Sequence, residues 1–218
     1  MGENRGNAVE IVEEQNARYY NGLPSVTTVL DILNEPWLAR WRGKVGNEEA
    51  DRITKQSAWT GTLFHDTIAA WETAGATEPI NTSLLDPDIT HLVNQYLQWK
   101  STTVTRWTLH EVPLVSRELG FGGTPDRIGV MNYDSNDCLT LVDFKTGRPS
   151  SKHRLQTAGY KLLLAYNQIH ISRRLCLYLP TITSDRKSIS AIEHTNHKGD
   201  LDAFINCLHL YLYTKSAH

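Results

Sequence analysis

The sequence predicts an α/β or α+β fold in which a central sheet follows an N-terminal helical region. Apolar residues recur at helical spacing before residue 105, and short alternating runs typical of strands follow it. At 218 residues, 40% of them apolar, the chain can form one domain with a substantial core. We expect a flexible N-terminus over residues 1–20 and a single domain over 21–218. That domain divides into a helical region over 21–104 and a sheet core over 105–218.

Four helices are predicted in the N-terminal region from the spacing of apolar residues. They cover residues 26–33, 36–56, 61–72 and 86–100. Ser25 is a suitable N-cap for the first helix, and Pro36 suits the first turn of the second. Gly43 and Gly46 can bend or split that second helix.

Three consecutive strands are predicted after the helical region, followed by a helix, two strands and a final helix. The three strands cover residues 106–116, 122–131 and 139–145 and form a meander, with turns at Gly120 and over residues 132–137. The later elements are a helix over 152–166, strands over 174–180 and 188–193, and a helix over 200–213.

Composition argues against several classes of protein. No apolar run approaches the roughly 20 residues that cross a bilayer, and the first residues lack the features of a signal peptide, so we expect a cytoplasmic protein without membrane contact. Cys138, Cys176 and Cys207 are widely spaced, which favours core packing over disulfides or a metal clip. The net charge of −2 argues against nonspecific coating of nucleic acid, although residues 40–44 and 152–154 leave a locally basic groove open.

The predicted strand over residues 139–145 ends with an acid and a base two positions apart. Alternate side chains of a strand share a face, so Asp143 and Lys145 point the same way and Phe144 points the other way. A surface ion pair at a fraying strand end would explain these residues if they stood alone. However, the preceding predicted strand carries Asp126, and a meander could bring Asp126 beside Asp143.

Two aspartates and the backbone carbonyl of Phe144 would make an all-oxygen site for a hard cation such as Mg²⁺ or Mn²⁺. Lys145, on the same face as Asp143, could position or help deprotonate a metal-bound water and stabilise charge on a phosphate. The alternative for Asp126 is a turn acid paired with Arg127. The combination of Asp126, Asp143 and Lys145 favours the metal site.

These motifs resemble the bipartite signature of the PD-(D/E)XK nuclease superfamily, with PD at residues 125–126 and DFK at residues 143–145. Gln156 and Tyr160 on the following helix match the QxxxY element of its RecB-like branch. The segment GTLFHDTI supplies His65 where that branch carries a histidine. The resemblance covers about two thirds of the chain, because GLPSVTTVL near the N-terminus is similar to the opening of phage and mitochondrial genome maintenance exonucleases of this branch.

The resemblance implies a role for each residue of the centre. Asp126 and Asp143 would bind Mg²⁺ or Mn²⁺ beside the Phe144 carbonyl, His65 would be a further metal ligand, and Lys145 would be the catalytic lysine. The chain lacks the four suitable cysteines of neighbouring nucleases with an iron–sulfur cluster, so no such cluster is expected. A histidine alone on an apolar helix is more often structural, and it is the other motifs that favour a ligand here.

Further residues are implied around this centre. Glu111, on the first predicted strand, stands where relatives often carry an acid that supports a second metal. The residues expected to bind DNA or support the site are Gln156, Tyr160, Lys152, Arg154 and Ser25. Helix-to-sheet packing is the alternative for the QxxxY pair.

The implied function is that of a metal-dependent DNA exonuclease that prefers single-stranded ends and acts in recombination, repair or replication, in a bacterial or phage-infected cell. Proteins of recombination or replication are candidate partners. The alternatives are a structure-specific endonuclease and a noncatalytic subunit that only binds nucleic acid. Tryptophans of the helical region could stack on unpaired bases, but their spacing favours core packing for Trp37, Trp41, Trp59 and Trp71.

Overall fold

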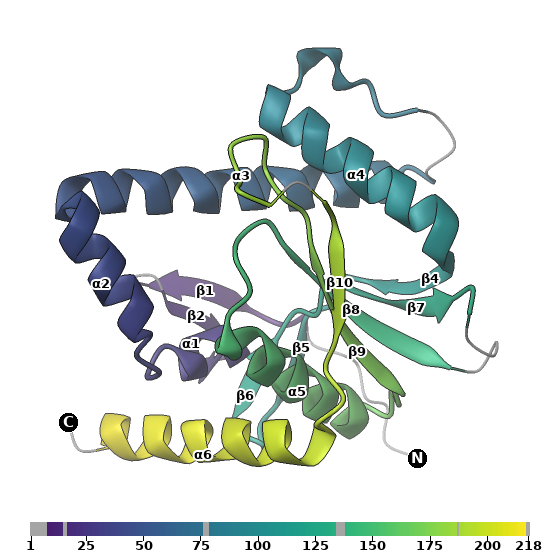
Figure 1. The fold of residues 1–218 in the computed structure, drawn as a ribbon. Helices are drawn as coiled ribbons and strands as arrows, with labels where there is room; N and C mark the ends of the chain where they lie inside the picture. The colour runs from purple at the N-terminus through teal and green to yellow at the C-terminus, as the bar shows by residue number, and fades with distance from the viewer. Residues whose placement is uncertain (1–7, 15–16, 76–78, 134–137, 187, 217–218) are drawn as a thin grey trace.

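The computed structural model describes residues 8–14, 17–75, 79–133, 138–186 and 188–216 (Figure 1). A five-stranded mixed sheet lies at its centre. In spatial order its strands are β10 (Ser190–Glu193), β9 (Arg173–Tyr178), β8 (Leu139–Lys145), β7 (Arg127–Met131) and β4 (Val104–His110). Helices cover both faces of this sheet (Figure 1). The predicted α/β (α+β) fold with a mixed central sheet is therefore confirmed.

The strands β4, β7 and β8 pair antiparallel, whereas β8 and β9 pair parallel. A parallel pair needs a crossover connection, and α5 (Ser151–Tyr166) supplies it. The parallel register sets Asp143 opposite Cys176, near the end of β8. The turn from β8 into α5 consequently starts at the edge of the sheet where Lys145 stands.

One face of the sheet packs against α3 (Asn47–Thr73) and α4 (Pro87–Thr103), which lie at the top of Figure 1. Phe64 of α3, Tyr96 of α4 and Phe144 of β8 are buried together there. Their aromatic edges meet the neighbouring faces at ring-centre distances of 5.3–6.1 Å. This cluster fixes α3 against the end of β8.

The opposite face packs against α5, α6 (His197–Ser216) and the short α1 (Val26–Leu30). Leu141 of β8 and Phe204 of α6 are fully buried in this second cluster. Along β8, Leu141 therefore contacts one helical layer while Val142 contacts the other. This is the alternation that the strand pattern predicts.

The helical region follows the prediction at one place, where a glycine divides a helix, and departs from it at another. The expected helix over residues 36–56 splits at Gly46, whose φ of 86° is readily adopted only by glycine, into α2 (Pro36–Val45) and α3. Helix α3 then continues without interruption through Gly61, so the expected boundary before that residue is absent. A short 3₁₀ helix, η1 (Thr82–Leu84), precedes α4.

The N-terminal segment contains strands where the sequence predicted flexibility over residues 1–20. A three-stranded antiparallel sheet is formed by β1 (Ile11–Glu14), β2 (Ala17–Tyr20) and β3 (Leu23–Pro24). Tertiary contacts explain the difference. The buried Tyr20 packs against Gly122, where a Cβ atom would lie 2.5 Å from that of Tyr20, and its hydroxyl is 2.7 Å from Thr124 Oγ1. Residues 1–7 and 15–16 lie outside the described residues.

The predicted meander needs one correction. The expected strand over 106–116 ends at His110, and the chain turns at Glu111, whose φ is 45°. A separate two-stranded sheet pairs β5 (Leu114–Ser116) with β6 (Phe121–Gly123), so the expected strand over 122–131 is also divided. Between β6 and β7 the chain passes through Asp126 outside any strand. The predicted turn over 132–137 lies partly outside the described residues, which stop at 133 and resume at 138.

The helices and the cysteines bear on two predictions made from composition. Within the described ranges, no helix is long and apolar enough to cross a membrane. Cys176 and Cys207 are buried as predicted, whereas Cys138 is half-buried. All three have free thiols.

Candidate active site

A cleft of about 860 Å³ opens at the edge of the sheet where β8 ends. Its walls come from α3, from the N-terminal strands and from the turn between β8 and α5. The predicted site residues that line it are Ser25, His65, Glu111, Asp126, Phe144, Lys145, Gln156 and Tyr160. Residues from distant parts of the sequence thus meet in one concave site.

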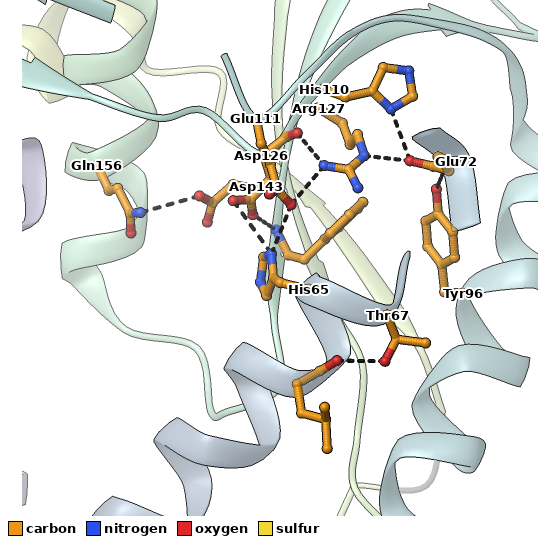
Figure 2. Close-up of polar contacts among 12 residues, drawn as sticks. His65, Thr67, Glu72, Tyr96, His110, Glu111, Asp126, Arg127, Asp143 and Gln156 are labelled. Carbon is orange, nitrogen blue, oxygen red and sulfur yellow. Dashed lines mark hydrogen bonds and ion pairs between the residues drawn. The ribbon is translucent and has the colours of Figure 1, made fainter. Parts of the chain in front are cut away.

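Asp126, Glu111 and His65 point toward one another in this cleft (Figure 2). The imidazole Nδ1 of His65 lies 3.8 Å from Asp126 Oδ1 and 3.8 Å from Glu111 Oε1. The other carboxylate oxygen of Asp126 accepts a hydrogen bond of 2.7 Å from the backbone N–H of Phe144. Asp126 therefore joins the approach to β7, the end of β8 and the helix that carries His65.

Asp143 and Lys145 form an ion pair on the α5 side of β8, in which Lys145 lines the cleft and Asp143 is buried behind it, outside the residues that line the cleft. Lys145 Nζ lies 2.6 Å from Asp143 Oδ2, and the Asp143 side chain is only 1% exposed. Gln156 of α5 donates from Nε2 to Asp143 Oδ1 at 3.2 Å and to the Tyr160 hydroxyl oxygen at 3.2 Å. The QxxxY element thus fixes the orientation of the Asp143 carboxylate through Gln156, with Tyr160 behind it.

Burial and neighbouring charges shift the ionisation of these groups. Burial raises the pKa of Asp143 to about 6, in spite of the Lys145 ammonium beside it. Burial lowers the pKa of Lys145, but the carboxylates of Asp143 and Asp126 outweigh it, so this pKa stands above its ordinary value. For His65 the same balance holds: burial lowers its pKa, and Asp126 and Glu111 raise it further than burial lowers it. The two carboxylates therefore favour the charged form of the Lys145 ammonium.

The side chains at this edge suit a hard divalent cation by their chemistry. Carboxylate oxygens of Asp126, Asp143 and Glu111, the imidazole of His65 and the carbonyl of Phe144 are donors that Mg²⁺ and Mn²⁺ accept. Across the described part of the chain, no three His, Cys, Asp or Glu side chains are gathered closely enough to enclose a cation as they stand. The hydrogen bonds to Asp143 and Asp126 account for this, because each turns a carboxylate toward a protein donor.

A second network adjoins the cleft and was not recognised in the sequence. Arg127, considered there only as a partner of the Asp126 side chain, instead donates to the Asp126 carbonyl oxygen, to Glu111 Oε1 and to Glu72 Oε2 of α3 (Figure 2). The Arg127 side chain is 0% exposed and that of Glu72 is 2% exposed. A charged residue on a predicted inward-facing strand position was the signal available for Arg127, because such residues are rarely buried without a partner.

Two predicted DNA-binding residues are placed elsewhere. Arg154 Nη2 lies 2.6 Å from Asp200 Oδ1 on α6, and Lys152 Nζ lies 3.7 Å from Asp31 Oδ1 after α1. Neither is among the described residues that line the cleft. The structure therefore does not bring them to the site, because the face of α5 that carries them turns toward α6 and α1. Ser25 does line the cleft, where its Oγ caps α1 by accepting the Thr28 N–H at 2.9 Å.

The tryptophans of the helical region do not all pack in the core. Trp37 of α2 is 45% exposed and Trp59 of α3 is 50% exposed, so the expectation of core packing is wrong for both. In α2, all of whose residues the structure describes, no side chain is fully buried. Trp41 is half-buried, and Trp71 lies under Lys100 Nζ, 4.5 Å from the ring centre. Aromatic surface is thus exposed on α2 and α3, although none of these tryptophans is among the described residues that line the cleft.

Comparison with known families agrees with this arrangement. Residues 37–198, more than half of the chain, match the family model of the PD-(D/E)XK nuclease superfamily. The chain belongs to this superfamily. Membership shows that the fold is one that carries nuclease sites, and the matched range includes His65, Glu111, Asp126, Asp143 and Phe144.

Solved structures are similar to this chain at low sequence identity. The crystal structure of SSO0001 is 14% identical with a TM-score of 0.39, covering 91% of this chain and 78% of that one. An alkaline exonuclease, LHK-Exo from Laribacter hongkongensis, is 16% identical with a TM-score of 0.37, covering 90% and 94%. LHK-Exo in complex with dAMP is 17% identical with a TM-score of 0.30, covering 72% and 85%. No curated protein matches this member of the superfamily.

Proposed function

We propose that the protein is a metal-dependent DNA exonuclease of the RecB-like branch that degrades single strands from free ends. The observation that carries the proposal is the meeting of His65 with Asp126, beside the Asp143–Lys145 pair, at one edge of the cleft. A protein that only bound nucleic acid would have no need to bury an aspartate and a lysine together, because burying two charges is costly.

Lys145 has the clearest chemical task. Its side chain is 19% exposed and lines the cleft, and its ammonium group lies 2.6 Å from Asp143 Oδ2. Because its pKa is raised, it stays protonated and can donate to a phosphate oxygen as negative charge grows there. In the hydrolysis, the oxygen of water bonds to phosphorus and the bond to the 3′ oxygen breaks, so the products carry a 5′ phosphate and a 3′ hydroxyl.

Asp126, Asp143, His65 and the Phe144 carbonyl would hold Mg²⁺ or Mn²⁺, with Glu111 as a further ligand. When bound, such an ion supplies Lewis-acid stabilisation of charge on the phosphate. Gln156 keeps one oxygen of Asp143 oriented through its 3.2 Å hydrogen bond.

Two features of the helical region support a preference for single-stranded ends. Helix α3 and the N-terminal strands both supply walls of the cleft, and a cleft walled by several elements favours a strand that enters by its end. The exposed rings of Trp37 and Trp59 can stack on unpaired bases, and α2 carries Arg40 and Lys44 for phosphates. With such a substrate, we propose that the protein acts in recombination, repair or replication. We propose that it does so in the cytoplasm.

The test is a nuclease assay on end-labelled linear single-stranded DNA, covalently closed single-stranded circles of the same sequence, duplex DNA and RNA. Each substrate is incubated with Mg²⁺, with Mn²⁺ and with chelator, and Asp143→Asn serves as a control for contaminating nuclease. We expect progressive loss of linear single strands that requires metal, and resistance of the circles. Equal digestion of circles from the first time point would favour a structure-specific endonuclease. No cleavage of any substrate would favour a noncatalytic subunit.

A further inference from the structure

We propose that Arg127 is a positioning residue that holds the Glu111 carboxylate toward the cation-binding edge of the cleft, and that Glu72 fixes Arg127 for this task. The inference rests on the proposed function, because it names a residue that acts through a candidate metal ligand. Glu111, Arg127 and Glu72 come from three elements: the turn after β4, strand β7 and helix α3.

Arg127 contacts all three segments with one guanidinium group. Its Nη1 donates to Glu111 Oε1 at 3.0 Å and to the carbonyl oxygen of Asp126 at 2.6 Å, and its Nε donates to Glu72 Oε2 at 2.8 Å. The side chain is fully buried, with its charged carbon 5.6 Å from the Phe144 ring centre. The planar guanidinium holds its N–H donors in a fixed relative arrangement. The position of Glu72 therefore influences where Arg127 can bind Glu111.

Glu111 needs such support. It stands at a φ of 45°, in the left-handed region that residues other than glycine rarely adopt, and its side chain is 31% exposed. Its backbone N–H donates to the Asp126 carbonyl oxygen at 3.0 Å, the same atom that Arg127 contacts. Without Arg127, a half-exposed carboxylate on a turn would be drawn toward solvent and away from His65.

Glu72 ties the same arginine to the helix of His65. Glu72 and His65 are seven positions apart, about two turns, and so lie on one face of α3. Glu72 is itself held by the Tyr96 hydroxyl, by Lys100 Nζ at 3.3 Å and by His110 Nδ1 at 3.0 Å. One buried network therefore sets both groups that stand 3.8 Å apart in the cleft, Glu111 and His65.

The test compares two paired substitutions that each remove a buried arginine together with its acid. Arg127→Met with Glu72→Gln removes the proposed positioning bridge without leaving a lone buried charge. Arg174→Met with Asp200→Asn removes a bridge of 2.8 Å whose side chains are 0% and 2% exposed on the opposite face of the sheet, where neither lines the cleft. Circular dichroism and urea unfolding establish that both proteins fold.

The decisive measurement is Mn²⁺ binding by calorimetry, which does not depend on cleavage. We expect the dissociation constant for Mn²⁺ to rise about 10–100-fold in the variant with Arg127→Met and Glu72→Gln (the 127/72 variant). Substitution of residues that orient metal ligands typically weakens metal binding by this factor. In the 174/200 variant the dissociation constant should be unchanged. The Mn²⁺ concentration that gives half-maximal cleavage should follow the same pattern.

A double-mutant cycle shows whether Arg127 acts through Glu111. If it does, Arg127→Met should weaken Mn²⁺ binding in the wild-type background and should have little further effect in Glu111→Gln. Full and equal effects in both backgrounds would overturn the inference, as would a folded 127/72 variant with wild-type affinity, or a wild-type protein that binds no Mn²⁺. Wild-type protein that binds Mn²⁺ but cleaves nothing would instead contradict the proposed function, and the calorimetry would still decide the role of Arg127.

Discussion

The sheet carries two arginines that are both 0% exposed, one on each face, and they are bonded in different ways. Arg174 has an acceptor for each of its five N–H groups. These acceptors are His197 Nδ1, the Arg154 carbonyl, Thr157 Oγ1, the His194 carbonyl and Asp200 Oδ2. Arg127, beside the cleft, leaves its Nη2 atom without a hydrogen-bond partner among the described residues.

The difference separates a structural network from one shaped by the site. Buried polar groups are almost always paired, so an arginine that serves only the fold is expected to be satisfied, as Arg174 is. Arg127 instead donates from Nη1 to two acceptors at the cleft edge, Glu111 Oε1 and the Asp126 carbonyl oxygen. This bonding is the basis for the proposal that Arg127 positions the Glu111 carboxylate.

The largest expected effect on stability belongs to Arg174. Arg174→Met should lower the free energy of unfolding by about 3–5 kcal/mol, because it removes all the hydrogen bonds of a buried arginine and leaves the buried Asp200 with Arg154 as its remaining charged partner. Arg127→Met should cost less, because it gives up fewer hydrogen bonds and Glu72 keeps Lys100 close by. Urea unfolding followed by circular dichroism measures both. A greater loss for Arg127→Met would reverse the comparison.

For catalysis the region of the cleft should matter more. Substitution of Asp143 should reduce turnover more than substitution of Asp200. Asp143→Asn should reduce turnover by about 10²–10³-fold, because it removes a charge at the cation-binding edge. Asp200→Asn should leave turnover of the folded protein unchanged, because Asp200 contacts Arg154 and Arg174, neither of which lines the cleft, whereas Asp143 contacts Lys145 and Gln156, which do. Initial rates on linear single strands in Mn²⁺ provide the measurement. Near-wild-type rates in Asp143→Asn would remove the proposed site.

The pH dependence of stability should also differ in sign. The pKa of Asp143 is raised by burial to about 6, so the folded state binds this proton more tightly than the unfolded chain. The contribution of Asp143 to the free energy of unfolding should therefore fall as pH rises from about 4 to about 6, by about 1–3 kcal/mol, and Asp143→Asn should lack this component.

For Asp200, burial raises the pKa but hydrogen bonds from Arg174 and Arg154 outweigh it, so the pKa is lowered. The stability that Asp200 contributes is present above its pKa in the unfolded chain and is lost as pH falls below about 4. Asp200→Asn should therefore reduce the fall in the free energy of unfolding at acidic pH. Urea unfolding from pH 3 to pH 7 covers both windows. Equal slopes in the two variants would contradict the assignment.

The smallest effect is expected for an exposed ion pair at the mouth of the cleft. Arg148 pairs with Asp185 at 2.5 Å, but the side chains are 75% and 84% exposed. Arg148→Ala should therefore change the free energy of unfolding by no more than about 0.5 kcal/mol. Because Arg148 lines the cleft, the same change should raise KM at low salt more than at high salt. A salt-independent KM would argue against contact with a phosphate.

The sequence by itself determined the centre of the candidate site. Asp143 and Lys145 share a face because strand side chains alternate, and Gln156 and Tyr160 share a face because helix residues four apart are neighbours. The structure places both pairs together, with Gln156 bonded to Asp143. Short-range periodicity is a property of the backbone, so it can be inferred from the order of residues.

Only the tertiary structure decided what surrounds that centre. The Glu111 turn, the burial of Glu72 beside Arg127, and the N-terminal strands anchored by Tyr20 all depend on contacts between segments far apart in the chain. The same is true of Arg154, which the packing of α5 against α6 turns toward Asp200. Spacing along the chain fixes which face of an element a residue occupies, but the partner of that face is set by how the elements pack. For this reason the acid–lysine pair could be predicted, whereas the network that positions its neighbours could not.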